Sequence, residues 1–238
     1  MRKNIILSPH CDDAAFSLGG LLLSGMIDNV VICTVFSISN CTYNDLEDSI
    51  ENITTIRKKE DEEFFKQCKS KIHLHYMDKL DAPIRMGNED LDVFNTSFTK
   101  KDREICTEII SFIEDNFSID DIIYAPLALG NHIDHYILFE VAADLAAEGY
   151  DVNYYEDLPY AANCSNYLLK RRISSLEERI ENVYSDLVRH SKISIIDKIS
   201  ALSIYRSQID PSIIKRISNY HYRISNDFVC YKTWGKKR

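Results

Sequence analysis

Residues 4–20 read NIILSPHCDDAAFSLGG. The short apolar run NIILS predicts a buried strand, and the apolar spacing of residues 14–27 predicts a helix. His10, Asp12 and Asp13 therefore lie where a strand ends and a helix begins. Adjacent carboxylates repel each other, and packing does not require them at this place. The polar cluster must have a partner elsewhere in the chain.

Short apolar runs alternate with longer amphipathic stretches over the first two thirds of the chain. Strands are predicted at residues 4–8, 30–37, 71–77, 121–127 and 151–158, and helices at residues 14–27, 53–69, 100–116 and 135–149. This alternation indicates an α/β fold around a mostly parallel sheet. In a doubly wound sheet with strand order 3-2-1-4-5, the first and fourth strands are neighbours.

The C-terminal portion, residues 165–238, is mostly helical in pattern. Its predicted elements are helices at residues 171–187 and 197–208 and a late strand at residues 228–234. No repeat, low-complexity segment or Pro/Gly linker interrupts the chain. We therefore expect residues 1–238 to form a single domain, with a core at residues 1–160 and a helical C-terminal addition.

Composition narrows the class of protein. The chain has 238 residues, 45% of them hydrophobic, and a formal net charge of -9 at pH 7. The negative charge argues against nucleic-acid binding, because phosphates require a basic surface. The seven cysteines are odd in number and include no C-x-x-C pair, so we expect reduced thiols in a cytoplasmic protein. The apolar stretch after the N-terminal MRK is too short for a signal peptide, and no other run is long enough to span a membrane.

A second polar cluster lies in LALGNHIDHYILFE, residues 127–140. His132, Asp134 and His135 form an H-x-D-H pattern directly after the fourth predicted strand. The carboxyl ends of neighbouring parallel strands form the crevice in which α/β proteins bind ligands. We therefore expect the two clusters to meet there, with the acids of the first sharing a cation with histidines of the second.

Ligand chemistry suggests roles within the combined cluster. A catalytic zinc ion has three protein ligands and an open position for water. His10 and Asp13 are three residues apart, so one turn can direct both at the same ion, and His135 completes the set. Asp12 must point elsewhere and can act as a base toward the attacking water. The same donors suit ferrous iron, so the metal is left open between Zn²⁺ and Fe²⁺.

His132 and Asp134 are not needed as ligands. Close to the cation, His132 can stabilise an oxyanion or protonate a leaving amine. Asp134 can orient one of the histidines from behind. Each acid also has a simpler interpretation, because a single aspartate at a helix start is often its N-cap. The presence of both clusters at adjacent strand ends favours the metal site.

Together, SPHCDDAAFSLGG and GNHIDH resemble the two signature motifs of the PIG-L/LmbE-like family of metal-dependent deacetylases, usually written H-P-D-D and H-x-D-H. Further resemblance lies in Arg57 and Glu60 and in the stretches LDAPIR (80–85), YYEDLPYA (154–161) and KISALSIYRSQ (198–208). The resemblance implies a Rossmann-like three-layer αβα sandwich. It also implies hydrolysis of an N-acetyl group on an N-acetylglucosamine-like amino sugar or its conjugate, with zinc as the expected ion.

Carried over by position, the resemblance implies that His10, Asp13 and His135 bind the metal. It makes Asp12 the general base and His132 the electrophilic or acid partner, with Asp134 tuning a histidine. It makes Arg57 and Asp81 candidate substrate contacts. Arg85 can hold a substrate carboxylate or phosphate, and can equally form a surface ion pair. Glu156, in the stretch YYED, can line a sugar pocket; alternatively, these tyrosines belong to the core and the acids cap the following turn.

Two departures from the family pattern affect the chemistry. Cys11 replaces the usual proline of the first motif, either as a spacer or as a soft ligand near the metal. Some members carry a carbonyl-polarising tyrosine two residues before the first histidine of the second motif, where this chain has Gly130. Any assistance from a tyrosine must therefore come from elsewhere.

Other functions stay open at this point. The same metal site could serve an amidase acting on a thiol conjugate, or another metal-dependent hydrolase such as a phosphoesterase. A nucleotide-binding module is a different class, but neither G-x-G-x-x-G nor G-x-x-x-x-G-K-[ST] follows the first strand. The expected partner is a small N-acetylated amino sugar or glycoconjugate, and a homo-oligomer is compatible with the sequence.

Overall fold

The computed structural model describes residues 2–43, 49–87, 92–179, 184–225 and 228–236. Its strands are β1 Asn4–Ser8, β2 Val30–Thr34, β3 Ile72–Tyr76, β4 Ile122–Pro126, β5 Asp151–Tyr155, β6 Tyr184–Ser194 and β7 Phe228–Lys236. Within these ranges they form one sheet in the order β3-β2-β1-β4-β5-β7-β6. The first five strands pair in parallel, and β7 and β6 add an antiparallel pair beside β5.

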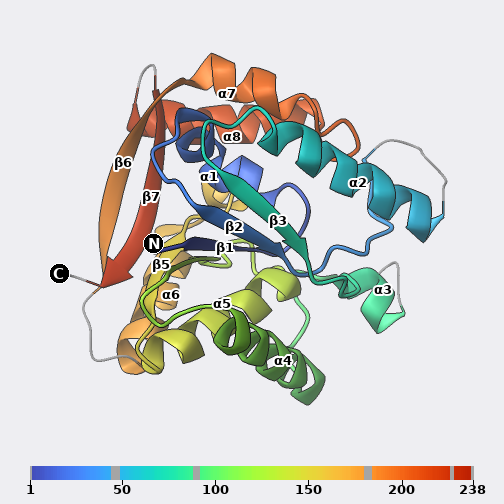
Figure 1. Cartoon of the computed structure of the whole chain (residues 1–238), viewed down its shortest axis with the longest axis vertical. Helices are drawn as coiled ribbons and strands as arrows, with labels where there is room; N and C mark the ends of the chain where they lie inside the picture. Colours follow the sequence, from blue (N-terminus) through green and yellow to red (C-terminus); the bar gives the residue numbers. More distant parts are fainter. Residues whose placement is uncertain (1, 44–48, 88–91, 180–183, 226–227, 237–238) are drawn as a thin grey trace.

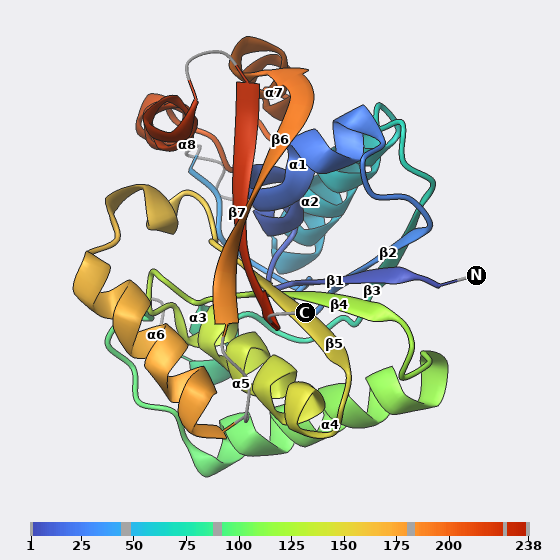
Figure 2. The ribbon, with the colours of Figure 1, turned by 90° about the vertical axis from the view of Figure 1, so that its left-hand side faces the viewer.

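Helices cover both faces of the sheet. They are α1 Asp13–Ser24, α2 Ile50–Phe65, α3 Ala82–Met86, α4 Lys100–Asn116, α5 Ile133–Ala147, α6 Asn166–Arg179, α7 Ile195–Leu202 and α8 Pro211–Ile224, with a 3₁₀ turn at Tyr160–Asn163. Figures 1 and 2 show α1, α2, α7 and α8 on one side of the sheet and α4, α5 and α6 on the other. The expected three-layer αβα sandwich is confirmed.

The central strands are apolar because helices cover them on both faces. Ile5, Ile6 and Leu7 of β1 have no exposed surface. In the register of the sheet, Ile6 pairs with Ile32 of β2 on one side and with Tyr124 of β4 on the other. The predicted order 3-2-1-4-5 is therefore correct, and the loops after β1 and β4 emerge side by side at one edge of the sheet.

The C-terminal portion is less helical than the sequence pattern indicates. A helix was expected over residues 171–187, but α6 ends at Arg179 and residues 184–194 form strand β6; residues 180–183 lie outside the described residues. The partner of β6 is β7, far along the chain, and no local pattern reports such a pairing. Gly20 of α1 permits close packing here, because its N–H donates to the Tyr231 hydroxyl and a Cβ would collide with that oxygen.

The predicted helix at residues 197–208 also ends early, at Leu202. The residues that follow bind α2 instead of extending the helix. The Tyr205 hydroxyl donates to Asp61 Oδ1 at 2.7 Å, and the Ser207 N–H and hydroxyl donate to the Glu60 carboxylate at 2.9 and 2.6 Å. These bonds hold the segment between α7 and α8 against α2.

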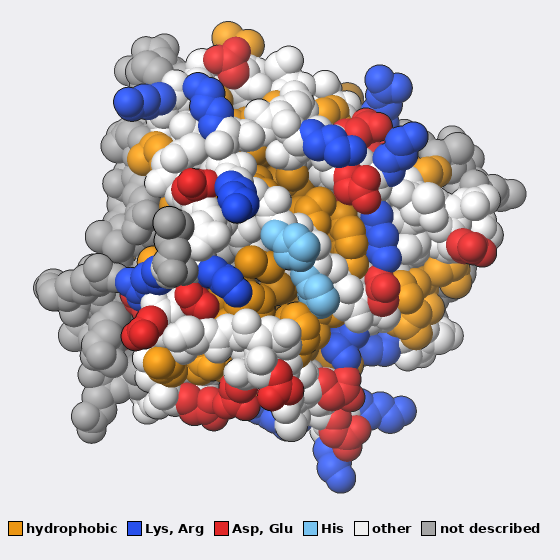
Figure 3. All heavy atoms as spheres, viewed as in Figure 1, with side chains coloured by type: hydrophobic (Ala, Val, Ile, Leu, Met, Phe, Trp, Pro, Cys, Tyr) orange, Lys and Arg blue, Asp and Glu red, His pale blue; other side chains and the backbone are white. Residues whose placement is uncertain are grey.

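Among the helices that the structure describes, none combines the length and the apolar character needed to cross a bilayer. On the face in Figure 3, acidic and basic side chains are interspersed, and histidine side chains lie over the edge strand β3.

Candidate active site

Asp12, in the loop between β1 and α1, does not use its side chain to cap the helix. Asp12 occupies the N-cap position with φ 131°, an unusual value for a residue other than glycine, and its side chain makes no capping bond. The Ser8 hydroxyl accepts the Ala14 N–H instead, at 3.1 Å. The capping interpretation therefore does not explain Asp12, whose carboxylate is free to face the crevice.

Asp13 lies between two histidines. Its Oδ2 is 3.2 Å from His10 Nδ1 and 3.3 Å from His135 Nε2. Ligands about 2.0–2.1 Å from a tetrahedral zinc ion are about 3.4 Å from one another, so these distances match those around one ion. His135 Nε2 is buried and has no hydrogen-bond partner. A metal ion would give this nitrogen the partner that the protein does not supply.

A buried carboxylate holds the other nitrogen of each histidine. His10 Nε2 lies 3.0 Å from Asp134 Oδ2, and His135 Nδ1 lies 2.9 Å from Asp157 Oδ2. Neither carboxylate has exposed surface. Such a partner fixes the tautomer and orientation of a ligating imidazole. The arrangement leaves His10 Nδ1 and His135 Nε2 facing Asp13.

Asp134 could also be grouped with His10 and His132 as a metal-binding set. Its oxygens, however, already accept bonds from the Ala82 N–H at 2.9 Å and from Arg85 at 2.8 Å, besides the contact with His10. A carboxylate engaged in this way is placed to orient a ligand. We therefore favour His10, Asp13 and His135 as the metal-binding group.

The charges in this group suit a cation. Burial alone lowers the pKa of His10, but Asp13 and Asp134 outweigh it and raise the pKa to about 9. The pKa of His135 rises to about 10, against burial, because of Asp13 and Asp157. The pKa of Asp13 is held far below its usual value, despite burial, by His135 and His10. The carboxylates thus favour positive charge here, and a divalent cation would displace the protons of both imidazoles.

Asp12 is close to this group but separate from it. Burial, together with the nearby charge of Asp13, raises the pKa of Asp12 to about 7. The Arg57 guanidinium opposes this shift, with one nitrogen 3.7 Å from Asp12 Oδ2. A carboxylate with a pKa near neutrality is suited to accept a proton from water at physiological pH.

His132 begins α5 and presents one nitrogen to the crevice. Its Nδ1 accepts the Asp134 N–H at 3.2 Å, so a neutral ring carries its proton on Nε2. Burial lowers the pKa of His132 to about 3, which keeps the ring neutral. Of the two roles expected from the sequence, this geometry favours hydrogen-bond donation to an oxyanion over protonation of an amine.

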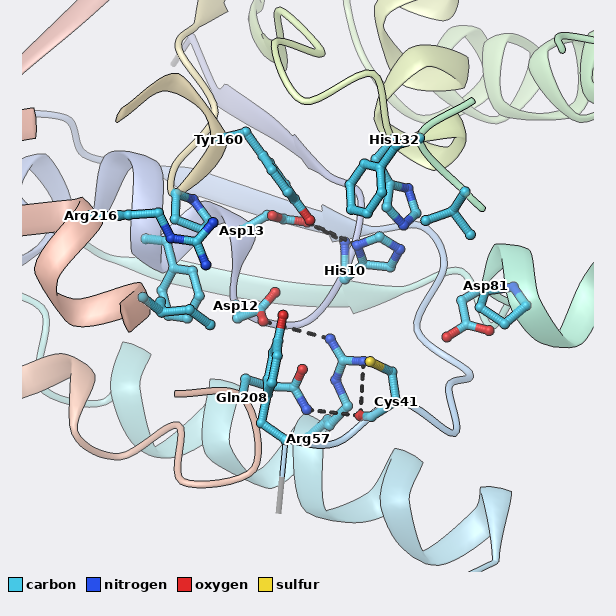
Figure 4. Close-up of a pocket in the computed structure, with 17 residues that line it drawn as sticks. His10, Asp12, Asp13, Cys41, Arg57, Asp81, His132, Tyr160, Gln208 and Arg216 are labelled. Atoms are coloured by element: carbon cyan, nitrogen blue, oxygen red, sulfur yellow. Dashed lines mark hydrogen bonds and ion pairs between the residues drawn. The ribbon is translucent and has the colours of Figure 1, made fainter. Parts of the chain in front are cut away.

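A cavity of about 430 Å³ opens over these residues and is lined by His10, Asp12, Asp13 and His132 (Figure 4). Aromatic side chains, among them Tyr43, Phe94 and Tyr160, line it as well. This volume is in the range of small-molecule sites. The two sequence clusters therefore meet at the base of one pocket.

A family comparison can now be set beside this geometry. The profile of the family described as PIG-L, GlcNAc-PI de-N-acetylase, matches residues 5–146. The chain belongs to this family. The match covers the parallel strands β1 to β4, nearly all of α5 and both polar clusters, as the sequence motifs indicated.

Relatives of this PIG-L protein are deacetylases by name. The 2'-N-acetylparomamine deacetylase of Streptomyces fradiae is 23% identical over 216 residues, 90% of this chain and 76% of that protein. The zinc-inhibited form of teicoplanin deacetylase Orf2 has a TM-score of 0.71 at 20% identity, with 99% of this chain and 98% of that chain covered. N,N'-diacetylchitobiose deacetylase from Pyrococcus horikoshii has a TM-score of 0.57 at 17% identity, with 98% and 83% covered. At these identities the solved structures establish the fold.

Two of the four predicted substrate contacts line the pocket. Arg57 donates to the Ser39 hydroxyl at 2.7 Å and to the Cys11 carbonyl at 3.3 Å, which holds it beside Asp12. Asp81 lines the pocket and also caps α3, accepting the Ile84 N–H at 3.4 Å.

Arg85 and Glu156 are not among the residues that line this pocket. Arg85 binds Asp134, the partner of His10, and stacks on the Phe36 ring, 4.9 Å from its centroid. Glu156 accepts hydrogen bonds from the Tyr220 hydroxyl at 2.9 Å and from Trp234 Nε1 at 3.1 Å. Glu156 thus joins α8 and β7 to the end of β5.

Sequence reasoning did not assign roles to Asp157 and Tyr160. Both lie in the stretch YYEDLPYA, after the end of β5. Because β5 is the neighbour of β4, its carboxyl end also reaches the crevice. The preceding tyrosines Tyr154 and Tyr155 are buried core residues. Adjacent acids of a strand point to opposite faces, and the sequence does not say that Asp157, rather than Glu156, faces the site.

The two departures from the family pattern are explained locally. Cys11 is buried, and burial followed by the charge of Asp61 raises the pKa of its thiol. It is absent from the metal-binding groups of the described residues, which supports the spacer interpretation. The absence of a side chain at Gly130 leaves room for the Tyr160 ring, which lies 5.2 Å from the His135 ring and reaches toward Asp13 (Figure 4).

Proposed function

We propose that the protein is a metal-dependent hydrolase that removes the N-acetyl group from an amino sugar or its conjugate, with Zn²⁺ as the expected ion and Fe²⁺ as the alternative. Family membership supports the reaction class. The observation that carries the proposal is the placement of Asp13 Oδ2 between His10 Nδ1 and His135 Nε2, a buried nitrogen with no hydrogen bond to any described residue.

The nucleophile is water, and Asp12 is its base. A divalent cation held by His10, Asp13 and His135 would supply Lewis acidity and make water acidic enough to react near neutral pH. The Asp12 carboxylate faces the same pocket without belonging to the ligand group, so it can take the proton as water adds to the acyl carbon. The resulting acid can return this proton to the leaving nitrogen, which releases an amine and acetate.

Two donors face the place where the carbonyl oxygen gains charge. His132 Nε2–H is directed into the pocket because Nδ1 is engaged with the Asp134 N–H. Tyr160 lines the same pocket (Figure 4), with its ring beside that of His135. Preorganised donors of this kind stabilise the tetrahedral intermediate more than the planar amide.

We also propose that residues 1–238 act as one catalytic domain. Gln208, Ile213 and Arg216, from the C-terminal portion, line the same pocket as His10 and Asp13. The core alone would therefore have an incomplete pocket wall.

The direct test is release of a primary amine from a panel of N-acetylated amino sugars and glycoconjugates, measured on zinc-loaded protein with and without a chelator. We expect release that the chelator abolishes and that zinc restores. No release from any panel member, with zinc demonstrably bound, would reject the amino-sugar assignment. A panel of thiol conjugates and phosphoesters would then identify which bond the site cleaves.

A further inference from the structure

The pocket has two chemically different ends. The metal-binding group, His132 and Tyr160 form one end, described above. At the other end the walls include Cys41 and Gln208, beside Arg57, and Arg216 enters from α8, on the side of the pocket away from Asp81 (Figure 4). The reacting N-acetyl group belongs at the first end, so the second end must contact the rest of the substrate.

Most charged groups around the pocket already have partners. The guanidinium of Arg57 is shared among Asp12, the Ser39 hydroxyl and the Cys11 carbonyl. Asp13 faces two histidines. Asp81 accepts the Ile84 N–H at the start of α3. Each of these side chains is therefore already engaged with charged or polar groups of the protein.

Arg216 differs from them. Its hydrogen bonds are to the Ser212 carbonyl and hydroxyl of the preceding turn, both at 3.4 Å. Within the described part of the chain it forms no ion pair with a carboxylate. The nearest acid on its own helix is Asp210, whose Oδ1 accepts the N–H groups of Ser212 and Ile213 at 2.6 and 2.9 Å. Tyr43 lines the same pocket; burial raises the pKa of its phenol, and the charge of Arg216 is among the smaller effects, here opposing the shift.

The helix presents Arg216 in a fixed direction. Ile213 and Arg216 are three residues apart, so they share one face of α8, and both line the pocket. Ile217 and Tyr220 are buried and anchor the helix to the body of the protein. Arg216 itself is half-buried, which weakens competition from water. Its planar guanidinium suits two-point binding of a carboxylate or a phosphate.

We propose that Arg216 binds an anionic group, a phosphate or a carboxylate, that the substrate carries on the side away from its N-acetyl group. The inference rests on the proposed deacetylase function, because it describes the same pocket. It assigns substrate selection to α8, which lies outside the family match at residues 5–146.

The test compares three substrates that share one reacting group. They are N-acetylglucosamine 1-phosphate, an N-acetylglucosamine glycoside of a hydroxy acid, and methyl N-acetylglucosaminide, which is neutral. For wild-type protein we expect one or both anionic substrates to exceed the neutral one in kcat/KM by roughly 10- to 100-fold, the usual effect of a hydrogen bond to a charged group. The difference between phosphate and carboxylate identifies which anion the site takes.

Substitutions on α8 distinguish the contribution of Arg216 to substrate selection from that of the other pocket residues. Arg216→Gln should lower kcat/KM for the preferred anionic substrate by roughly 10- to 100-fold and so abolish the preference, whereas Arg216→Lys should retain part of it. Lys215→Gln is the matched control, because Lys215 is exposed on the same helix and does not line the pocket. It removes the same charge and should change neither value.

A binding measurement keeps the inference separate from the activity. Calorimetry on chelator-treated protein should show tighter binding of glucosamine 1-phosphate than of glucosamine, and Arg216→Gln should remove the difference. If no substrate releases an amine but this difference is present, the deacetylase function fails and the anion site stands. Equal binding of the two sugars by wild-type protein, with equal kcat/KM for all three substrates, would overturn the assignment of Arg216.

Discussion

The ring of Tyr160 occupies the space that a side chain at position 130 would need: a Cβ on Gly130 would lie 2.5 Å from Tyr160 Cγ. The two positions therefore cannot both carry a side chain in this arrangement. Because residue 130 has no side chain, there is space beside the metal-binding group, and the Tyr160 ring, from the segment after β5, fills it. This relationship makes two substitutions informative about one hydroxyl.

Tyr160→Phe should lower kcat by about 100- to 1000-fold, as expected for loss of an oxyanion donor, with little change in KM. The ring remains, so bound zinc should be unchanged when measured by elemental analysis. Tyr167→Phe is the control, because Tyr167 is 75% exposed on α6. A wild-type kcat for Tyr160→Phe would exclude the hydroxyl from the reaction.

Gly130→Ala should produce a similar loss of kcat by displacing the Tyr160 ring, although the hydroxyl is still present. The double variant Gly130→Ala with Tyr160→Phe should then be no slower than Tyr160→Phe alone, because both changes remove one interaction. If the losses in kcat of the two single variants multiply in the double variant, Gly130 acts in some other way than by making room for Tyr160.

Asp157→Asn should weaken zinc binding by about 10- to 100-fold, because Asp157 orients His135 from behind. Titration of the metal-free protein against a competing chelator measures this affinity. Activity should return at high zinc concentration, since the ligands themselves are intact. Asp120→Asn, an exposed acid after α4, is the matched control and should leave the affinity unchanged.

Much of this site could be predicted because two clusters of unusual composition follow two strands of clear pattern. The apolar runs mark β1 and β4 as strands, and the order 3-2-1-4-5 of a doubly wound sheet makes them neighbours. His10 and His135 are then expected together in the crevice at the carboxyl ends of these strands. The donor types restrict the chemistry further. Neither step requires a side-chain position that only the folded chain can show.

The remaining features depend on contacts between distant parts of the chain. Glu156 and Asp157 are equivalent by sequence, and only the packing of β5 against β7 directs Glu156 to Trp234 and Asp157 to His135. The late strand predicted at residues 228–234 corresponds to β7, but its partner β6 was missed for a related reason. Its pairing joins residues that are far apart in the sequence, and the pattern next to α6 continues that of a helix.

Asp12→Asn and Asp13→Asn should separate base from ligand. Asp12→Asn should keep zinc and lose about 100- to 10,000-fold in kcat, the usual contribution of a general base. Asp13→Asn should lose zinc, because Asp13 supplies the carboxylate between the two histidines. Metal analysis and amine release on the same samples measure both effects. Loss of zinc from Asp12→Asn would place Asp12 among the ligands.

The pH dependence of activity should report Asp12. Its pKa of about 7 belongs to the carboxyl that must be ionised to accept a proton, so kcat/KM should fall as pH decreases through this range. A bound metal ion adds positive charge, so this fall in kcat/KM, the acid limb of the pH profile, moves to lower pH. Arg57 favours the ionised form from 3.7 Å, so Arg57→Gln should move the limb upward by about 1–3 units, whereas Arg57→Lys should keep it near the wild-type position. A profile of kcat/KM from pH 5 to 9 for the three proteins decides this, and a limb that Arg57→Gln leaves in place would mean that another group titrates.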